Sequence, residues 1–189
     1  MNIAAAHLVL ATTVYVRALE QQGTPAMKHR FTLDALRELI VARRDGEHGL
    51  RICVDHVQSS RLRPMLLAHL AECTQALQEL RSLVRLLGGE SEPLDFVAAH
   101  RKWADLRAAL ACNDDGVILD ECERGESRAL EVYRNALDDP LPEPVRTIVL
   151  RQFEDVMINH DQIRDLRSQP RLGVDLGAGG DNGAQAGPH

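Results

Sequence analysis

Two segments of the sequence place a Gly-Glu pair in the middle of an otherwise apolar helical pattern. Residues 44–49 read RDGEHG, and residues 123–127 read ERGES. In each segment the glutamate, Glu47 or Glu126, occupies a position where the core of a helical bundle would normally have Leu or Ile. Carboxylate oxygens inside a bundle can bridge two metal cations and balance their charge. The repeat therefore predicts two carboxylates that converge in the interior of the molecule.

Four long helices are predicted to position these acids, because apolar residues recur at spacings of three, four and seven. The predicted helices cover residues 32–57, 62–87, 116–137 and 143–168. Thr32 is the expected N-cap of the first helix, Gly88 is expected to end the second, and Pro170 stops the fourth. On the fourth helix the pattern places Phe153 and His160 on the buried side.

The predicted connections favour an all-α, ferritin-like four-helix bundle made of two antiparallel helical hairpins. Few residues join the first two helices, and the turn at 138–142 joins the last two, so each pair must be antiparallel. The connector between the hairpins is long enough to run the length of a bundle and contains a short helical pattern from Val97 to Leu110. One long crossover of this kind distinguishes ferritin-like bundles from up-down-up-down bundles. When Glu47 is aligned with Glu126, the apolar positions keep their phase, which indicates a duplicated hairpin.

The ligand set of a di-iron bundle is incomplete in this sequence. Such a site takes a Glu from each of two helices and a Glu-x-x-His pair from each of the other two. At the centre of the second helix the sequence has Cys73 and Ala76 in place of that pair. The fourth helix keeps His160, but Met157 occupies the glutamate position. A standard di-iron oxidase site is therefore not expected.

A reduced, mononuclear metal site is the alternative that the same residues leave open. Imidazole, thiolate and carboxylate ligands together would suit Zn or Fe. The candidate ligands are Glu47, Glu126, His160, His69 and Cys73.

A purely structural role is the competing interpretation for each of these residues. Arg43 or Arg44, four and three residues before Glu47, could pair with its carboxylate. Arg43 or the Tyr133 hydroxyl could do the same for Glu126, since a buried acid without a partner is costly. The two histidines would then be core residues with ordinary hydrogen-bond partners.

Composition sets the class of protein. The chain has 189 residues, of which 44% are hydrophobic and only 3% aromatic, which favours one helical domain. A net charge of -6 with interspersed charges argues against nucleic acid as a partner. The most apolar stretch, residues 3–16, is too short to cross a membrane. Four cysteines without disulfide or CxxC spacing indicate reduced thiols and a cytoplasmic protein. They are Cys53, Cys73, Cys112 and Cys122.

The expected domain organisation has three parts. Residues 1–30 are interpreted as an N-terminal extension that is flexible or an over-extended start, and residues 31–169 as the bundle. Residues 170–189 form a Gly-rich tail that cannot bury enough apolar surface to order itself and is predicted to be disordered.

From about residue 33 to residue 167 the chain resembles a bacterial four-helix-bundle family of unknown function within the ferritin-like superfamily. The resemblance rests on the segments 45–47 (DGE), 86–90 (LLGGE), 121–126 (ECERGE), 141–146 (LPEPVR) and 160–166 (HDQIRDL). It implies the fold but no settled biochemistry. More distant members of the superfamily are oxidases or iron stores, and some bacterial relatives are stress-associated.

Three interpretations of function follow. The first is a small cytoplasmic bundle that acts as a binding or stress-associated protein without catalysis. The second is a metal-dependent oxidase or peroxide-handling protein built on Glu47, Glu126 and His160. The third is a homo-oligomeric structural module with flexible ends.

Overall fold

The computed structural model describes residues 26–90, 106–108, 110 and 114–168, and this part of the chain is helical with no strand. The four long helices are α2 (Ala26–His56), α3 (Leu62–Leu86), α5 (Asp115–Asp138) and α6 (Glu143–Ser168). Residues 1–25 of the predicted extension, most of the predicted helix at 97–110, and the predicted disordered tail lie outside the described residues. Residues 26–30, which were predicted to belong to the extension, are instead the first residues of α2. The all-α bundle expected from the sequence is confirmed.

Local signals explain most of the helix ends. The Asp114 side chain accepts a hydrogen bond from the Gly116 amide and so caps α5. Gly88 has a positive φ of 71°, and the following Gly89 amide donates to the Val84 carbonyl, which ends α3 as a glycine C-cap does. The predicted N-cap at Thr32 is wrong: α2 begins at Ala26, so Thr32 lies inside the helix and is buried.

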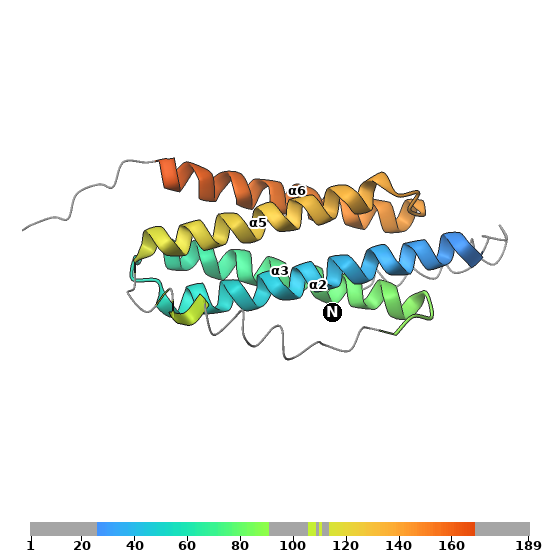
Figure 1. Cartoon of the computed structure of the whole chain (residues 1–189), viewed down its shortest axis with the longest axis horizontal. Helices are drawn as coiled ribbons and strands as arrows, with labels where there is room; N and C mark the ends of the chain where they lie inside the picture. Colours follow the sequence, from blue (N-terminus) through green and yellow to red (C-terminus); the bar gives the residue numbers. More distant parts are fainter. Residues whose placement is uncertain (1–25, 91–105, 109, 111–113, 169–189) are drawn as a thin grey trace, which may run out of the picture.

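The helices form two antiparallel hairpins that pack side by side (Figure 1). α2 packs closely against both α3 and α5, α5 packs closely against α6, and α3 and α6 meet at fewer positions. α3 and α5 run in the same direction, so the end of α3 and the start of α5 lie at opposite ends of the bundle. This is the single-crossover arrangement of ferritin-like bundles.

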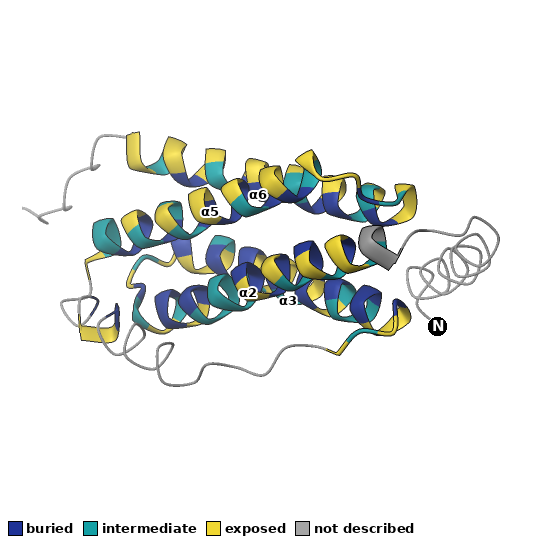
Figure 2. Cartoon of the chain, turned by 45° about the vertical axis from the view of Figure 1, so that its right-hand side comes forward, coloured by how far each residue is buried: buried dark blue, intermediate teal, exposed yellow. Residues whose placement is uncertain are grey.

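Buried residues follow the inner faces of all four helices (Figure 2). They gather in two apolar clusters, one that contains Leu36, Leu80 and Val149, and one that contains Val57, Leu66 and Ile118. Between these clusters along the chain, α2 has Arg43 and α5 has Glu126, both buried. The middle of the bundle is therefore a polar layer, and the functional candidates lie in it.

None of the helices in the described part of the chain is long and apolar enough to cross a membrane.

Candidate functional site

Glu126, near the middle of α5, is a carboxylate enclosed by the bundle core. Only 5% of its surface is exposed, and its Oε2 atom has no hydrogen-bond partner. Burial disfavours the charged form and, with a smaller contribution from Glu72, raises the pKa of Glu126 to about 7, although the positive charge of Arg43 opposes this shift. At neutral pH both the protonated and the charged form of this carboxyl group are therefore populated.

Arg43 on α2 is the buried cation of the same layer, with 3% of its surface exposed. Its Nε atom donates to the Tyr133 hydroxyl at 2.9 Å, and its guanidinium carbon lies 5.2 Å from the centre of the Tyr133 ring. Burial works against its charge, but Tyr133, Cys73 and Glu126 together raise the pKa of Arg43. Arg43 therefore remains positively charged although it is almost completely enclosed.

A chain of hydrogen bonds carries this polar layer across all four helices. The Tyr133 hydroxyl on α5 donates to Gln152 Oε1 on α6 at 2.7 Å. Gln152 Nε2 in turn donates to the Ala76 carbonyl at 3.3 Å and to Glu79 Oε2 at 2.8 Å, both on α3. Because a buried polar group is costly when it has no partner, this connected network braces the core.

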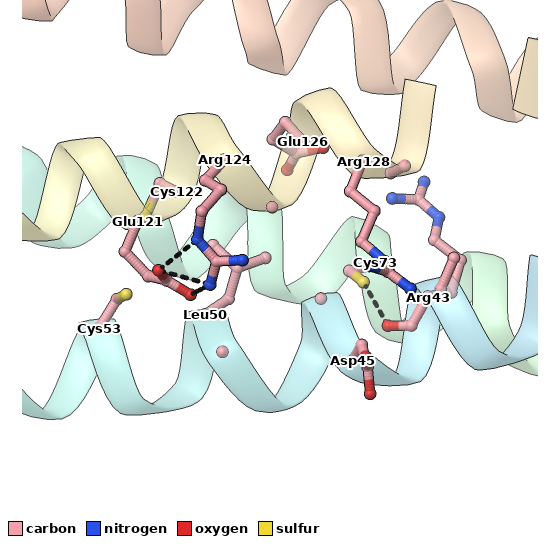
Figure 3. Close-up of a pocket in the computed structure, with 15 residues that line it drawn as sticks. Arg43, Asp45, Leu50, Cys53, Cys73, Glu121, Cys122, Arg124, Glu126 and Arg128 are labelled. Atoms are coloured by element: carbon pink, nitrogen blue, oxygen red, sulfur yellow. Dashed lines mark hydrogen bonds and ion pairs between the residues drawn. The ribbon is translucent and has the colours of Figure 1, made fainter. Parts of the chain in front are cut away.

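A small cavity of about 50 Å³ lies where α2 and α5 face each other, and Glu126 lines it (Figure 3). Gly46, Gly49 and Gly125 also line it. A Cβ atom built on Gly125 would meet nothing within 4 Å, and one on Gly46 would come to 3.5 Å from Cys73 Sγ. Because these glycines have no side chains, they leave the space that Glu126 lines.

The rim of the cavity carries charged groups. Arg124 and Arg128 line it and are exposed. Arg124 is bound to Glu121 by an ion pair on the same helix. Arg128 extends from α5 toward α2 (Figure 3). Buried Glu126 and Arg43 thus lie at the inner end of the cavity, and the charged groups of Arg124 and Arg128 lie at its exposed rim.

The two repeated carboxylates do not share this cavity, contrary to the expectation from the aligned segments. Glu47 accepts hydrogen bonds from the Thr74 hydroxyl at 3.0 Å and from Arg51 at 3.1 Å, and its side chain is 18% exposed. It does not line the cavity, where Gly46 takes the corresponding place on α2. Neither Arg43 nor Arg44, the partners considered from the sequence, makes this ion pair.

The other three predicted ligands are also held by separate partners. Cys73 lines the cavity and donates its thiol hydrogen to the Arg43 carbonyl, with Sγ 3.1 Å from that oxygen. His69 is buried between α3 and α6, with Nε2 3.2 Å from Gln162 Oε1. His160 lies 3.2 Å from the Ser127 hydroxyl and is only partly buried. Of the five predicted residues, Glu126 and Cys73 line the cavity, and Glu47, His69 and His160 do not.

These positions do not fit the two-metal centre that the fold family implies. Such a centre needs carboxylates and histidines from four helices around one point. In the described part of the chain, no group of three or more His, Cys, Asp or Glu residues is arranged to hold a metal ion. The polar interior instead contains the hydrogen-bonded network of Arg43, Tyr133 and Gln152, which reaches α3 at Ala76 and Glu79.

The sequence interpretation missed the polar residues of α6. The structure buries Gln152 and Asn159, whereas Phe153 and His160, which were expected on the buried side, are only partly buried. Asn159 Nδ2 donates to Glu72 Oε2 on α3 at 3.0 Å. The signal was present: buried positions alternate by four and three without a break once Gln and Asn are accepted in the core. They are Val145, Val149, Gln152, Val156, Asn159 and Ile163.

Comparison with known proteins supports the fold and the family. The family model described as a domain of unknown function (DUF2383) matches residues 31–139, more than half of the chain. No curated protein matches the sequence. The chain is similar to the crystal structure of a two-domain protein from Anabaena variabilis that contains DJ-1/ThiJ/PfpI-like and ferritin-like domains. The TM-score is 0.60 at 12% identity, and the match covers 72% of this chain and 38% of that one.

At this identity the likeness shows the fold alone, and this chain spans well under half of the Anabaena protein. The resemblance stated from the sequence is confirmed by both comparisons. The chain belongs to the DUF2383 family and has a ferritin-like four-helix-bundle fold.

Proposed function

We propose that this protein binds a small ligand without transforming it, and that its site is the Glu126 cavity. The observation that carries the proposal is the Oε2 atom of Glu126, which is buried, lines a cavity and has no hydrogen-bond partner. Buried polar atoms in folded proteins are almost always paired, so an unpaired carboxylate oxygen needs an explanation. A ligand that donates a hydrogen bond to this oxygen provides one.

The surrounding groups support binding in preference to catalysis. Arg43 donates to the Tyr133 hydroxyl, which donates to Gln152, and all three side chains are buried. A residue held in this way can position a ligand, but it is not placed to transfer protons to a second reacting group. Within the polar layer on α2 and α5, the Oε2 atom of Glu126 is the buried oxygen without a hydrogen-bond partner and is free to bind a ligand.

The size and charge of the cavity limit the ligand. A volume of about 50 Å³ admits only a few heavy atoms, because one water already needs roughly 10–15 Å³ on this scale. Glu126 calls for an N–H or O–H donor at the inner end, and Arg128 favours a negative group at the rim. A small amine or a short amino acid, with its amino group inward, meets both requirements.

Binding of a graded series of probes tests the proposal. Ammonium, methylamine and glycine would be titrated into the full chain while the backbone amide signals of Gly46, Gly49 and Gly125, which line the cavity, are followed by NMR. We expect saturable shifts in the wild type and in Glu131→Gln, an exposed control on the same helix. The shifts should disappear in Glu126→Gln. Equal binding by Glu126→Gln, or no binding of any probe to the wild type, would refute the proposal.

A reducing, cytoplasmic location is part of this proposal. Cys53, Cys73 and Cys122 are free thiols, and all three are buried, which supports it.

A further inference from the structure

Cys53 on α2 and Cys122 on α5 form a thiol pair that the binding proposal does not use. Both are free and buried, both belong to the same apolar cluster, and both line the Glu126 cavity. Their sulfur atoms point toward each other across the contact between the two helices (Figure 3). The pair therefore lies where the two hairpins of the bundle meet.

Glycines lie close to both thiols along their helices. Gly49 is one turn before Cys53, and Gly125 is nearly one turn after Cys122. Both glycines line the cavity beside the thiols, and α2 and α5 pack against each other around it. Cys73 has a different environment, because it is on α3 and its thiol donates to the Arg43 carbonyl.

The environment of the pair selects the reagent that can reach it. Interaction with the Cys53 thiol, followed by burial, raises the pKa of Cys122 well above its usual range. Cys122 therefore stays protonated at neutral pH and does not react by itself with dissolved electrophiles. The cavity of about 50 Å³ is too small for bulky thiol reagents but has room for hydrogen peroxide, which has two heavy atoms.

We propose that Cys53 and Cys122 are a peroxide-oxidised pair that closes into a disulfide between α2 and α5. In the first step the Cys53 sulfur attacks one peroxide oxygen and the O–O bond breaks. The Cys53 proton leaves with the departing hydroxyl group as one water, and Cys53 becomes a sulfenic acid. In the second step the Cys122 sulfur attacks the Cys53 sulfur, and the Cys122 proton leaves with the hydroxyl group as a second water. Two thiols are oxidised by two electrons, and one peroxide is reduced to two waters.

The bond would join the two hairpins covalently. It would close a loop of 69 residues, since 122 minus 53 is 69. Closure of so long a loop restricts the unfolded chain strongly. The oxidised protein should therefore unfold at a higher temperature than the reduced one, and a dithiol reductant should reverse the change.

The inference is independent of the proposed ligand, because it needs the two sulfur atoms and not the Glu126 oxygen. Glu126→Gln should lose ligand binding and keep the disulfide. Cys53→Ala should lose the disulfide, and failure of one proposal leaves the other standing.

Peptide mapping of the full chain tests the pair. Reduced protein would be treated with hydrogen peroxide, alkylated after denaturation, digested without reductant and analysed by mass spectrometry. We expect a peptide that links residue 53 to residue 122, and a fall in alkylated thiols from the four of the sequence to two. The link should persist in Cys73→Ala, the matched buried control, and be absent in Cys53→Ala and Cys122→Ala.

Reaction rates separate a built-in pair from oxidation during unfolding. Hydrogen peroxide should form the link at least tenfold faster than oxidised glutathione, which is too large for the cavity. Absence of the 53–122 peptide in folded wild type, a link to a different cysteine, or equal rates with both oxidants would overturn the proposal.

Discussion

The interface between α2 and α5 differs from the interface between α3 and α6 in how polar groups are treated. α2 and α5 pack closely and leave a cavity lined by glycines, with an unpaired carboxylate oxygen and two facing thiols. α3 and α6 make fewer close contacts. They are bridged by side chains: Gln152 bonds to Glu79, and Asn159 to Glu72.

The difference shows what the polar groups contribute to stability at each interface. Across α3 and α6, hydrogen bonds replace part of the apolar packing, so these side chains hold the hairpins together. Across α2 and α5 the packing is already close, and Glu126 adds an electrostatic cost instead of a bond. A costly, unpaired group in a well-packed region is where function is expected, because stability alone would favour its removal.

A single truncation should lower the free energy of unfolding most at the interface between α3 and α6. Gln152→Ala removes the partner of the Tyr133 hydroxyl, of the Ala76 carbonyl and of Glu79, and leaves buried polar atoms unpaired. We expect the free energy of unfolding to fall by about 4 kcal/mol. Urea denaturation measures this. Gln78→Ala, an exposed change on α3, should stay within about 0.5 kcal/mol of the wild type.

At the interface between α2 and α5, removal of the Glu126 charge should instead increase the free energy of unfolding. The unfolded Glu126 carboxyl loses its proton near pH 4.5, but the folded one keeps it to about pH 7. Between these values only the unfolded state releases the proton, so the free energy of unfolding falls as pH rises, by about 3 kcal/mol in total.

Glu126→Gln should abolish this pH dependence and be more stable than the wild type above pH 7 by up to about 3 kcal/mol. Denaturation curves at pH 4.5, 6 and 8 test it, with Glu131→Gln as a control that keeps the wild-type slope. A parallel pH dependence in Glu126→Gln would show that the slope comes from other groups, such as Glu72 beside it.

Filling the glycine-lined space should stabilise the helix and close the site. Gly125→Ala gains about 1 kcal/mol of helix propensity, and its new Cβ meets no atom within 4 Å. We expect a higher melting temperature together with weaker binding of the amine probes. A gain in stability with unchanged binding would place the ligand away from Gly125.

The smallest effect is expected for the carboxylate that the structure leaves outside the cavity. Glu47→Gln should cost about 0.5 kcal/mol, because it weakens a partly exposed ion pair with Arg51 and changes one bond from Thr74. It should leave amine binding as in the wild type. A loss of binding as large as that in Glu126→Gln would restore the converging pair expected from the sequence.

The bundle could be predicted from the sequence because helix length, apolar spacing and loop length are local properties. The stripe of α3 predicted Leu66, Cys73 and Leu80 as core residues, and all three are buried. The phase of α6 was misassigned because apolar character alone was used to choose its inner face. Gln152 and Asn159 are accepted there because α3 supplies partners for them, and those partners cannot be found from α6 alone.

The sequence by itself determined that four amphipathic helices form two hairpins and that acids occur near the middle of α2 and α5, since these are properties of spacing along one chain. Only the tertiary structure decided which acid is enclosed. α2 packs against both α3 and α5, and Gly46 and Arg43 face the interior at this level, so Glu47 is turned outward to Thr74 and Arg51. On α5 the same register turns Glu126 inward, and burial beside a cation already committed to Tyr133 leaves its oxygen unpaired.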